Sequence, residues 1–228
     1  MNHIVELQYP ESKDRSMTNG LFICFEGGEG SGKSTQLKLL KRKLERYGIL
    51  PVSIREPGGT GFGDKLREIL MFSKEELTPE AELLLFNASR SQLVYKVISP
   101  ALHEGKLVLC DRFSASTLAY QGYGRGISLK KVEGANNIAT NGLAPDLNIF
   151  LDLSPEEGLN RLPPGRDRFE MQGIEEFHER VRFGYLALIE KDPSRWVVID
   201  GLQTPEEISQ IIWQIVEPML HKIIRQDK

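Results

Sequence analysis

A glycine-rich octapeptide near the start of the chain lies between an apolar run and a helical pattern. The apolar run is LFICFE at residues 21–26, and the octapeptide GGEGSGKS at residues 27–34 matches G-x-x-x-x-G-K-[ST] at every fixed position. Glycines let consecutive backbone N–H groups turn inward around a phosphate, and the N-terminus of the following helix adds a partial positive charge. The sequence therefore predicts a strand, a phosphate-binding loop and a helix in immediate succession.

The rest of the chain alternates short β-rich runs with longer helical patterns. The β-rich runs are continuously apolar rather than alternating, which is typical of strands that are covered on both faces. The expected strands are residues 21–26, 52–55, 107–111, 147–152 and 196–200, and the clearest helices are residues 33–47 and approximately 79–103. In the first of these helices Leu37, Leu40, Leu44 and Tyr47 share a face, and Gly48 supplies the stop. This alternation predicts an α/β fold with a five-stranded parallel sheet, and ligands then bind beyond the carboxyl ends of the strands.

Composition excludes several classes of protein. The 29 basic and 32 acidic residues give a net charge of −3, so no nucleic acid is expected as a partner. No stretch is long and apolar enough for a membrane span, and the N-terminus lacks the apolar core of a signal peptide, so a cytoplasmic protein is expected. Cys24 and Cys110 are expected as core thiols. Residues 1–19 are interpreted as a flexible extension, and residues 20–228 as one domain.

The octapeptide and one strand end predict a metal-assisted phosphate site. Lys33 is expected to neutralise the β and γ phosphates of a nucleoside triphosphate, and the Ser34 hydroxyl to ligate Mg²⁺. Asp111 ends the third strand and is expected to hold the magnesium through water, the alternative being a surface carboxylate that caps the next helix. GTPases, ATPases and small-molecule kinases share this loop. The chain contains neither N-K-x-D nor D-x-x-G, which a guanine-nucleotide switch should carry.

Arginines gather at loop and helix positions around the glycine clusters: Arg55, Arg67, Arg90, Arg112 and Arg125. The arginine side chain pairs bidentately with phosphate, so several arginines near a phosphate loop suggest a second phosphate-bearing ligand that faces the triphosphate. Arg90 lies within LLLFNASRSQL, beside the apolar face of a helix, and should therefore have a partner.

At this point the chain resembles the bacterial-type subgroup of the thymidylate kinase family over nearly all of residues 20–220. The resemblance rests on FEGGEGSGKSTQ at 25–36, REPGGT at 55–60, LLFNASR at 84–90, DRFSASTLAYQG at 111–122 and NGLAPDL at 141–147. It implies a P-loop nucleoside monophosphate kinase fold with a short lid near residues 154–172. It also implies transfer of a phosphoryl group from ATP, with Mg²⁺, to dTMP for dTTP biosynthesis, and a homodimer.

The resemblance also implies which residues bind the two nucleotides. Phe86 stacks on the thymine ring, Arg90 hydrogen-bonds the thymine O4 atom, and Ser116, Thr117 and Gln121 lie close to the edge of the base. Because Phe86 and Arg90 are four residues apart on one helix, both can point into one pocket. The loop residues that bind ATP are Gly27, Gly28, Glu29, Gly30, Ser31, Gly32, Lys33, Ser34 and Thr35.

Further positions match the family's acceptor site. Arg67 and Arg112 grip the acceptor phosphate, Arg112 with a catalytic role, and Arg55 supports them. Tyr120 crowds the 2′ carbon of the sugar and so favours deoxyribose. Glu29 approaches the 3′-hydroxyl.

One departure within the wider family concerns the catalytic charge. Some members carry an arginine where this chain has Gly30, whereas the subgroup without it supplies an arginine from the lid. The candidates are Arg161, Arg166 and Arg168, any one of which could reach the phosphates.

Two rival functions share parts of this pattern. A deoxynucleoside kinase would use Glu56 as a base toward a neutral 5′-hydroxyl, but it would leave Arg67 and Arg112 without a joint purpose. A P-loop switch would hydrolyse nucleotide slowly and show no dependence on an acceptor.

Overall fold

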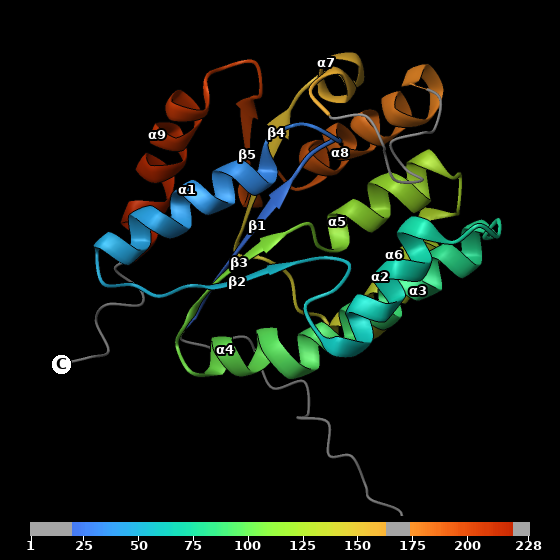
Figure 1. Ribbon diagram of the computed structural model, residues 1–228, viewed down its shortest axis with the longest axis horizontal. Helices are drawn as coiled ribbons and strands as arrows, with labels where there is room; N and C mark the ends of the chain where they lie inside the picture. The colour runs from blue at the N-terminus through green and yellow to red at the C-terminus, as the bar shows by residue number, and fades with distance from the viewer. Residues whose placement is uncertain (1–19, 163–173, 221–228) are drawn as a thin grey trace, which may run out of the picture.

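The structure is a computed structural model of the chain, and it describes residues 20–162 and 174–220. The expected extension at residues 1–19 lies outside the described residues, and so does most of the expected lid. The remainder forms a central sheet with helices packed against both of its faces (Figure 1).

All five predicted strands are present with the predicted end residues. They are β1 (Leu21–Glu26), β2 (Val52–Arg55), β3 (Leu107–Asp111), β4 (Leu147–Asp152) and β5 (Trp196–Asp200). The order across the sheet is β2-β3-β1-β4-β5, and every neighbouring pair is parallel. Both central strand ends, at Glu26 and Asp111, therefore meet at the same edge of the sheet.

The α-helices of the described residues are α1 (Lys33–Arg46), α2 (Gly61–Phe72), α3 (Pro79–Leu93), α4 (Ser99–His103), α5 (Ser114–Thr117), α6 (Leu129–Thr140), α7 (Pro155–Asn160), α8 (Glu179–Lys191) and α9 (Pro205–Val216). Three π-helical segments are η2 (Val94–Ile98), η3 (Leu118–Gly124) and η4 (Ile174–His178), and two 3₁₀ segments are η5 (Pro193–Arg195) and η6 (Glu217–Leu220).

Two helix predictions need refinement. The pattern at residues 79–103 is helical throughout, but the π-helical η2 separates α3 from α4. Helix α1 ends at Arg46, one residue early, and Tyr47 is 61% exposed instead of buried with the leucines. The ring of Tyr47 stacks on Trp213 of α9 at 4.9 Å between centroids, so it covers the rim of the core rather than entering it.

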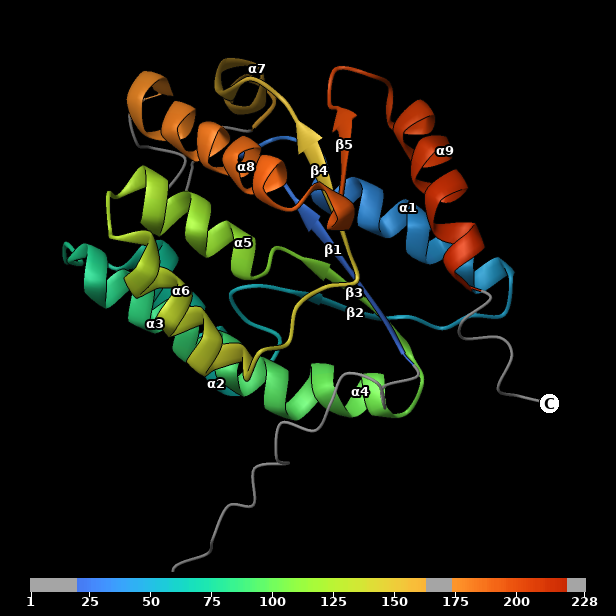
Figure 2. The ribbon, with the colours of Figure 1, turned by 180° about the vertical axis from the view of Figure 1, so that it is seen from behind.

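The sheet explains why its strands lack an alternating polar pattern. On β1, Leu21, Ile23 and Phe25 pack with α1 and α9, whereas Phe22 and Cys24 pack on the opposite face with η2 and α4. Figures 1 and 2 show α1 and α9 together on one side and α4, α5 and α8 on the other. Because both faces are covered, every residue of β1 is buried.

The two cysteines lie in this core. Cys24 and Cys110 are paired in register on β1 and β3, and both are free and buried, which confirms the prediction of core thiols. Burial raises the pKa of both thiols, so neither is an activated nucleophile. In the part of the chain that the structure describes, no helix is long and apolar enough to cross a membrane.

Candidate active site

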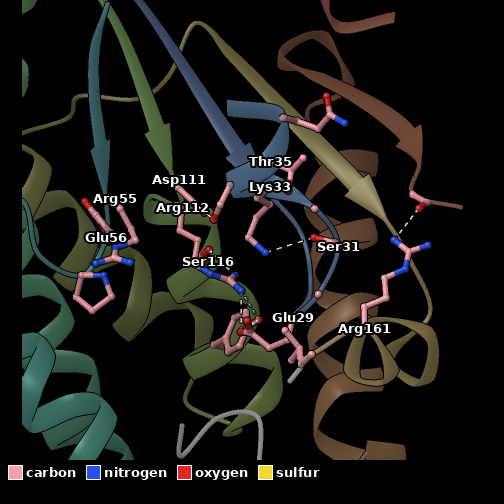
Figure 3. A pocket seen from close by; sticks show the side chains of 18 of the residues that line it. Glu29, Ser31, Lys33, Thr35, Arg55, Glu56, Asp111, Arg112, Ser116 and Arg161 are labelled. Carbon is pink, nitrogen blue, oxygen red and sulfur yellow. Dashed lines mark hydrogen bonds and ion pairs between the residues drawn. The ribbon is translucent and has the colours of Figure 1, made fainter. Parts of the chain in front are cut away.

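A cavity of about 720 Å³ opens at the carboxyl edge of the sheet. Its walls come from the segments that follow each of the five strands, as expected for an open parallel sheet. Figure 3 shows Lys33 between Arg112 on one side and Arg161 on the other. The predicted site residues that line the cavity are Glu29, Gly30, Ser31, Gly32, Lys33, Ser34, Thr35, Arg55, Arg67, Phe86, Arg90, Asp111, Arg112, Ser116, Thr117, Tyr120, Gln121 and Arg161.

The remaining predicted residues fall into two groups. Gly27 and Gly28 do not line the cavity, but their carbonyl oxygens accept hydrogen bonds from Lys33 Nζ at 3.1 and 2.6 Å. Arg166 and Arg168 lie outside the described residues, so their role in a lid stays a prediction.

The phosphate loop has the backbone that its glycines predict. Gly27, Gly30 and Gly32 have positive φ angles of 147°, 65° and 93°, and helix α1 begins directly after Gly32. Lys33 is buried beneath this loop, and burial, reinforced by the Arg112 cation, lowers the pKa of its ammonium to about 8. Anionic phosphate oxygens are the natural partners for such a desolvated cation.

Any larger residue at position 30 would force the backbone of the phosphate loop or of α7 to shift. A Cβ atom at this position would overlap the carbonyl oxygen of Gly158 on α7, and the φ angle of 65° disfavours other residues. The loop arginine that some family members carry at this position has no room here.

We expect Gly30→Ala to lower the free energy of unfolding by at least about 1–2 kcal/mol through backbone strain and overlap. Gly28→Ala is the matched control, because a Cβ there meets nothing within 4 Å. Thermal unfolding of both variants checks this, and equal melting temperatures would contradict the close packing of the loop on α7.

Ser34 and Asp111 meet as the sequence predicts. The Ser34 hydroxyl donates to Asp111 Oδ2 at 2.5 Å. Asp111 is buried, and the N-cap of the next helix is Phe113, so the alternative of a surface capping carboxylate is wrong. A hydroxyl and a carboxylate are oxygen ligands of the kind that Mg²⁺ takes alongside water and phosphate, so this pair fits the metal.

Arg112 joins the phosphate loop to the opposite wall. Its φ angle of 71° is rare for a residue with a side chain, which marks a position held by its surroundings. Its Nη1 donates to Gly27 O at 2.9 Å, and its Nη2 donates to Glu29 Oε1 at 2.7 Å and to the Tyr120 hydroxyl at 3.0 Å. Tyr120 also donates to Glu29 at 2.7 Å.

The charge of Glu29 follows from this arrangement. Burial acts to raise the pKa of its carboxyl, but the Arg112 and Lys33 cations and the Tyr120 hydrogen bond lower it to about 2. Glu29 is therefore a carboxylate at every physiological pH, and it can accept a hydrogen bond from a ligand hydroxyl.

Beneath Arg112 lies a polar cluster that sequence reasoning found only in part. Glu26, the last residue of β1, is fully buried and accepts from Phe113 N, from Ser116 Oγ at 2.6 Å and from the Tyr185 hydroxyl at 3.0 Å. Tyr185 on α8 also accepts from Arg112 at 3.3 Å. No sequence signal distinguished Tyr185 from a core aromatic residue, because its partners are 159 and 73 positions away.

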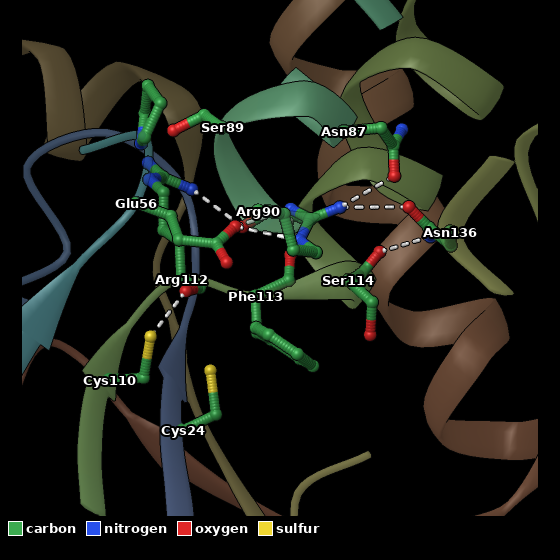
Figure 4. Close-up of polar contacts among 12 residues, drawn as sticks. Cys24, Glu56, Asn87, Ser89, Arg90, Cys110, Arg112, Phe113, Ser114 and Asn136 are labelled. Atoms are coloured by element: carbon green, nitrogen blue, oxygen red, sulfur yellow. Dashed lines mark hydrogen bonds and ion pairs between the residues drawn. The ribbon is translucent and has the colours of Figure 1, made fainter. Parts of the chain in front are cut away.

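Arg90 has the partner that its apolar surroundings require. It is 1% exposed, and its guanidinium pairs with Glu56 Oε2 at 2.6 Å from Nη2 and at 2.8 Å from Nε. The remaining N–H groups reach Asn136 Oδ1 at 2.8 Å, Phe113 O at 3.1 Å and, more weakly, Asn87 Oδ1 at 3.4 Å (Figure 4). If Arg90 contacts a nucleobase, it must therefore share N–H groups that already donate to protein acceptors.

Glu56 is the partner that the sequence did not identify. It is 4% exposed, and burial raises the pKa of its carboxyl while Arg90 opposes the rise. A carboxylate bound to a buried arginine is poorly placed as the general base that a deoxynucleoside kinase would need.

The other predicted base and phosphate contacts also lie on the cavity wall. The amide nitrogen of Gln121 donates to Glu82 at 2.8 Å, which fixes the orientation of the amide. Arg67 donates to Pro57 O at 3.1 Å, next to Arg55 and Glu56. On the side of the cavity opposite Arg55 and Arg112, Arg161 donates to Gly201 O at 3.0 Å.

Comparisons with known proteins agree with this geometry. A model of the thymidylate kinase family matches residues 25–212. The chain is 51% identical over 200 residues to a thymidylate kinase of Synechococcus sp. (strain JA-3-3Ab), covering 88% of this chain and 97% of that one. It is 50% identical over 204 residues to one of Dehalococcoides mccartyi (strain CBDB1), covering 88% and 97%. A crystal structure of thymidylate kinase from Ehrlichia chaffeensis superposes with a TM-score of 0.73 at 34% identity, over 87% and 98% of the two chains. The chain belongs to the thymidylate kinase family.

Proposed function

We propose that the chain transfers the γ-phosphoryl group of ATP to the 5′-phosphate of dTMP, forming dTDP and ADP. The observation that carries this proposal is one cavity lined by a phosphate loop and, beside it, by Arg55, Arg67 and Arg112. Lys33 in the loop and the three arginines beside it form two cationic groups in one cavity. Such an arrangement can bind two phosphate-bearing ligands next to each other.

On the donor side, the loop at residues 27–35 holds the polyphosphate, and Lys33 neutralises its terminal phosphates. Ser34 and Asp111 are the residues that would hold Mg²⁺. Magnesium bound there would neutralise charge that develops on the transferring group.

On the acceptor side, Arg112 and Arg67 bind the 5′-phosphate and Arg55 supports them. The thymine is bound by Phe86, Arg90, Ser116, Thr117 and Gln121. The Ser116 hydroxyl already donates its hydrogen to Glu26. Tyr120 and Glu29 face the deoxyribose. Because the second pKa of a phosphate monoester is about 6, the attacking oxygen of dTMP needs no strong general base. The cations of Lys33, Arg112 and the lid arginines act by positioning the two phosphates and by neutralising their charge.

The assembly and location that we propose are those expected from the sequence, namely a cytoplasmic homodimer. Residues 83–97 carry many apolar side chains, of which Leu83 and Leu93 belong to the core, whereas Leu84 is 63% exposed. On the neighbouring helices Phe72 and Ile138 are 70% and 84% exposed. These side chains support an apolar contact between two copies.

The test is release of ADP in the presence of a panel of nucleoside monophosphates and thymidine. We expect dTMP to give the largest kcat/KM. Faster turnover with thymidine would favour a deoxynucleoside kinase, and ADP release that does not respond to any acceptor would favour a nucleotide switch.

The pKa of Lys33 predicts a proton linkage. At pH 8.5 most of the Lys33 ammonium has lost its proton in the ligand-free protein, since its pKa is about 8. Bound polyphosphate raises this pKa, so we expect ATP binding to take up a proton at pH 8.5, much less at pH 7, and to weaken as the pH rises through 8. Titration calorimetry in two buffers of different ionisation enthalpy measures the uptake, and an equal uptake by Lys33→Ala would contradict the assignment.

A further inference from the structure

Arg125 is the arginine of the sequence pattern to which the proposed function gives no role, and it pairs with a buried carboxylate. That carboxylate is Glu82 on α3, which is 1% exposed. Arg125 meets it as a fork, because Nε donates to Glu82 Oε1 at 3.1 Å and Nη2 donates to Oε2 at 3.0 Å. The guanidinium also lies over the ring of Phe177, 4.8 Å from its centroid. The fork holds both oxygens of Glu82 in fixed positions.

The same carboxylate orients the side-chain amide of Gln121. The amide nitrogen, Nε2, donates to Glu82 Oε1 at 2.8 Å. Because a carboxylate only accepts hydrogen bonds, the nitrogen end of the amide must face Glu82. The amide oxygen, Oε1, is then directed away from Glu82. Glu82 therefore decides which end of the Gln121 amide is presented to a ligand.

The amide oxygen of Gln121 is accessible from the cavity. Gln121 lines the cavity, and no described residue donates a hydrogen bond to its Oε1. In the part of the chain that the structure describes, the side-chain oxygens that are both buried and without a partner are Gln36 Oε1, Ser53 Oγ and Glu56 Oε1. Since Gln121 Oε1 has no partner and is not one of these shielded oxygens, it retains contact with the cavity.

The part of the cavity beside Gln121 is the part assigned to the nucleobase. Glu82, Phe86 and Arg90 follow one another at intervals of four residues on α3, so they share one face of the helix. Phe86 and Arg90 line the cavity, whereas Glu82 does not. Glu82 can therefore act on a bound base through Gln121 and not by direct contact.

The chemistry of the base edge decides what an oxygen at this place selects. In thymine and uracil the ring atom N3 carries a hydrogen, whereas in cytosine the same atom carries a lone pair. An acceptor oxygen pairs with the first kind of edge and is left unpaired, facing a second acceptor, by the other.

We propose that Glu82 is a positioning residue for selection of the acceptor base. Anchored by Arg125, it holds Gln121 Oε1 toward the base, where this oxygen accepts the hydrogen of N3 and discriminates against cytosine. Glu82 does not touch the nucleotide, and its effect passes entirely through the orientation of Gln121. The inference rests on the proposed function, because it assumes that a pyrimidine lies against Phe86.

The experiment compares dTMP, dUMP and dCMP as acceptors with wild-type protein, Glu82→Gln and Glu80→Gln. Of these nucleotides dUMP keeps the N3 hydrogen and lacks only the methyl group, whereas dCMP lacks the N3 hydrogen. Glutamine has the size of Glu82, but its amide can donate to Gln121, so the Gln121 amide is free to turn over. Glu80 lies on the same helix and is exposed, which makes Glu80→Gln the matched control. Steady-state kinetics give kcat/KM, titration calorimetry gives the dissociation constants, and thermal unfolding shows whether each variant is folded.

In Glu82→Gln we expect the ratio of kcat/KM for dTMP to that for dCMP to fall about tenfold, the usual effect of one hydrogen bond. The ratio of dTMP to dUMP should keep its wild-type value, because both bases carry the N3 hydrogen. Glu80→Gln should change neither ratio. An unchanged ratio of dTMP to dCMP in Glu82→Gln would overturn the proposal. An equal loss for all three nucleotides, or a parallel change in both ratios, would also overturn it, because a general loosening of the pocket gives those results.

A second variant tests the same inference from the other side of the ion pair. Arg125→Met removes the fork that fixes the Glu82 carboxylate, and it should lower the ratio of dTMP to dCMP in the same sense. It replaces Glu82→Gln if that variant does not fold, and an unchanged ratio would then overturn the proposal. If wild-type protein phosphorylates none of the three nucleotides, the proposed function fails, and the dissociation constants of dTMP and dCMP for the same variants still test Glu82.

Discussion

Replacing Lys33 by alanine should lower kcat for phosphoryl transfer by at least about 100-fold, the scale at which removal of one group that stabilises transition-state charge acts. The affinity for dTMP should change little, because the acceptor side of the cavity is built from Arg55, Arg67 and Arg112. Lys33 is buried at the centre of the phosphate loop, so no other described lysine can replace its charge there. Steady-state kinetics with dTMP and ATP, together with dTMP binding by calorimetry, separate the two effects.

Lys38→Ala is the matched control, since Lys38 lies on the same helix and is exposed. It should leave kcat unchanged. Near-normal turnover by Lys33→Ala would refute the assignment of the loop to the donor. A large loss of dTMP affinity would instead show that Lys33 belongs to the acceptor site.

The second large effect concerns the buried pair of Arg90 and Glu56. Arg90→Ala leaves the Glu56 carboxylate buried without its cation, and we expect this to lower the free energy of unfolding by about 3–5 kcal/mol. The double variant Arg90→Met/Glu56→Gln removes both charges and should be markedly more stable than Arg90→Ala. Chemical denaturation of the wild type and both variants measures the difference, and a double variant no more stable than Arg90→Ala would contradict the pairing.

The pH dependence of Arg90→Ala has a definite sign. Burial already raises the pKa of Glu56, and loss of Arg90 removes the main opposing influence, so the pKa rises further. Between the pKa of the unfolded chain and that of the folded state, the folded state binds the extra proton, so stability falls as the pH rises. Arg90→Ala should accordingly lose less stability at pH 5 than at pH 8. Loss of dTMP affinity without loss of stability would assign Arg90 to the base alone.

The predictable part of the site is local in the sequence. Residues 27–34 could be assigned to phosphate because their spacing alone sets the loop geometry. Asp111 could be linked to them because parallel strands end at the same edge of the sheet. The assignments of Phe86 and Tyr120 came from the family resemblance, and their place on the cavity wall is consistent with it.

The helical region after Asp111 was harder to predict. The chain forms the short helix α5 and the π-helical η3 between residues 114 and 124, where no helix is predicted from the sequence. Such a segment has no regular apolar period, and buried polar side chains such as Ser116 and Gln121 hold it through contacts with Glu26 and Glu82.

The sequence by itself determined the five strands, their end residues and the phosphate loop, because continuous apolar runs and a glycine motif depend on neighbours in the chain. Only the tertiary structure decided which side chains meet: Arg90 with Glu56, Tyr185 with Glu26, and Gln36 with Pro205, at separations of 34, 159 and 169 positions. Burial forces each of these polar groups to find a partner, but the partner is chosen by the strand order and helix packing, which no local pattern encodes.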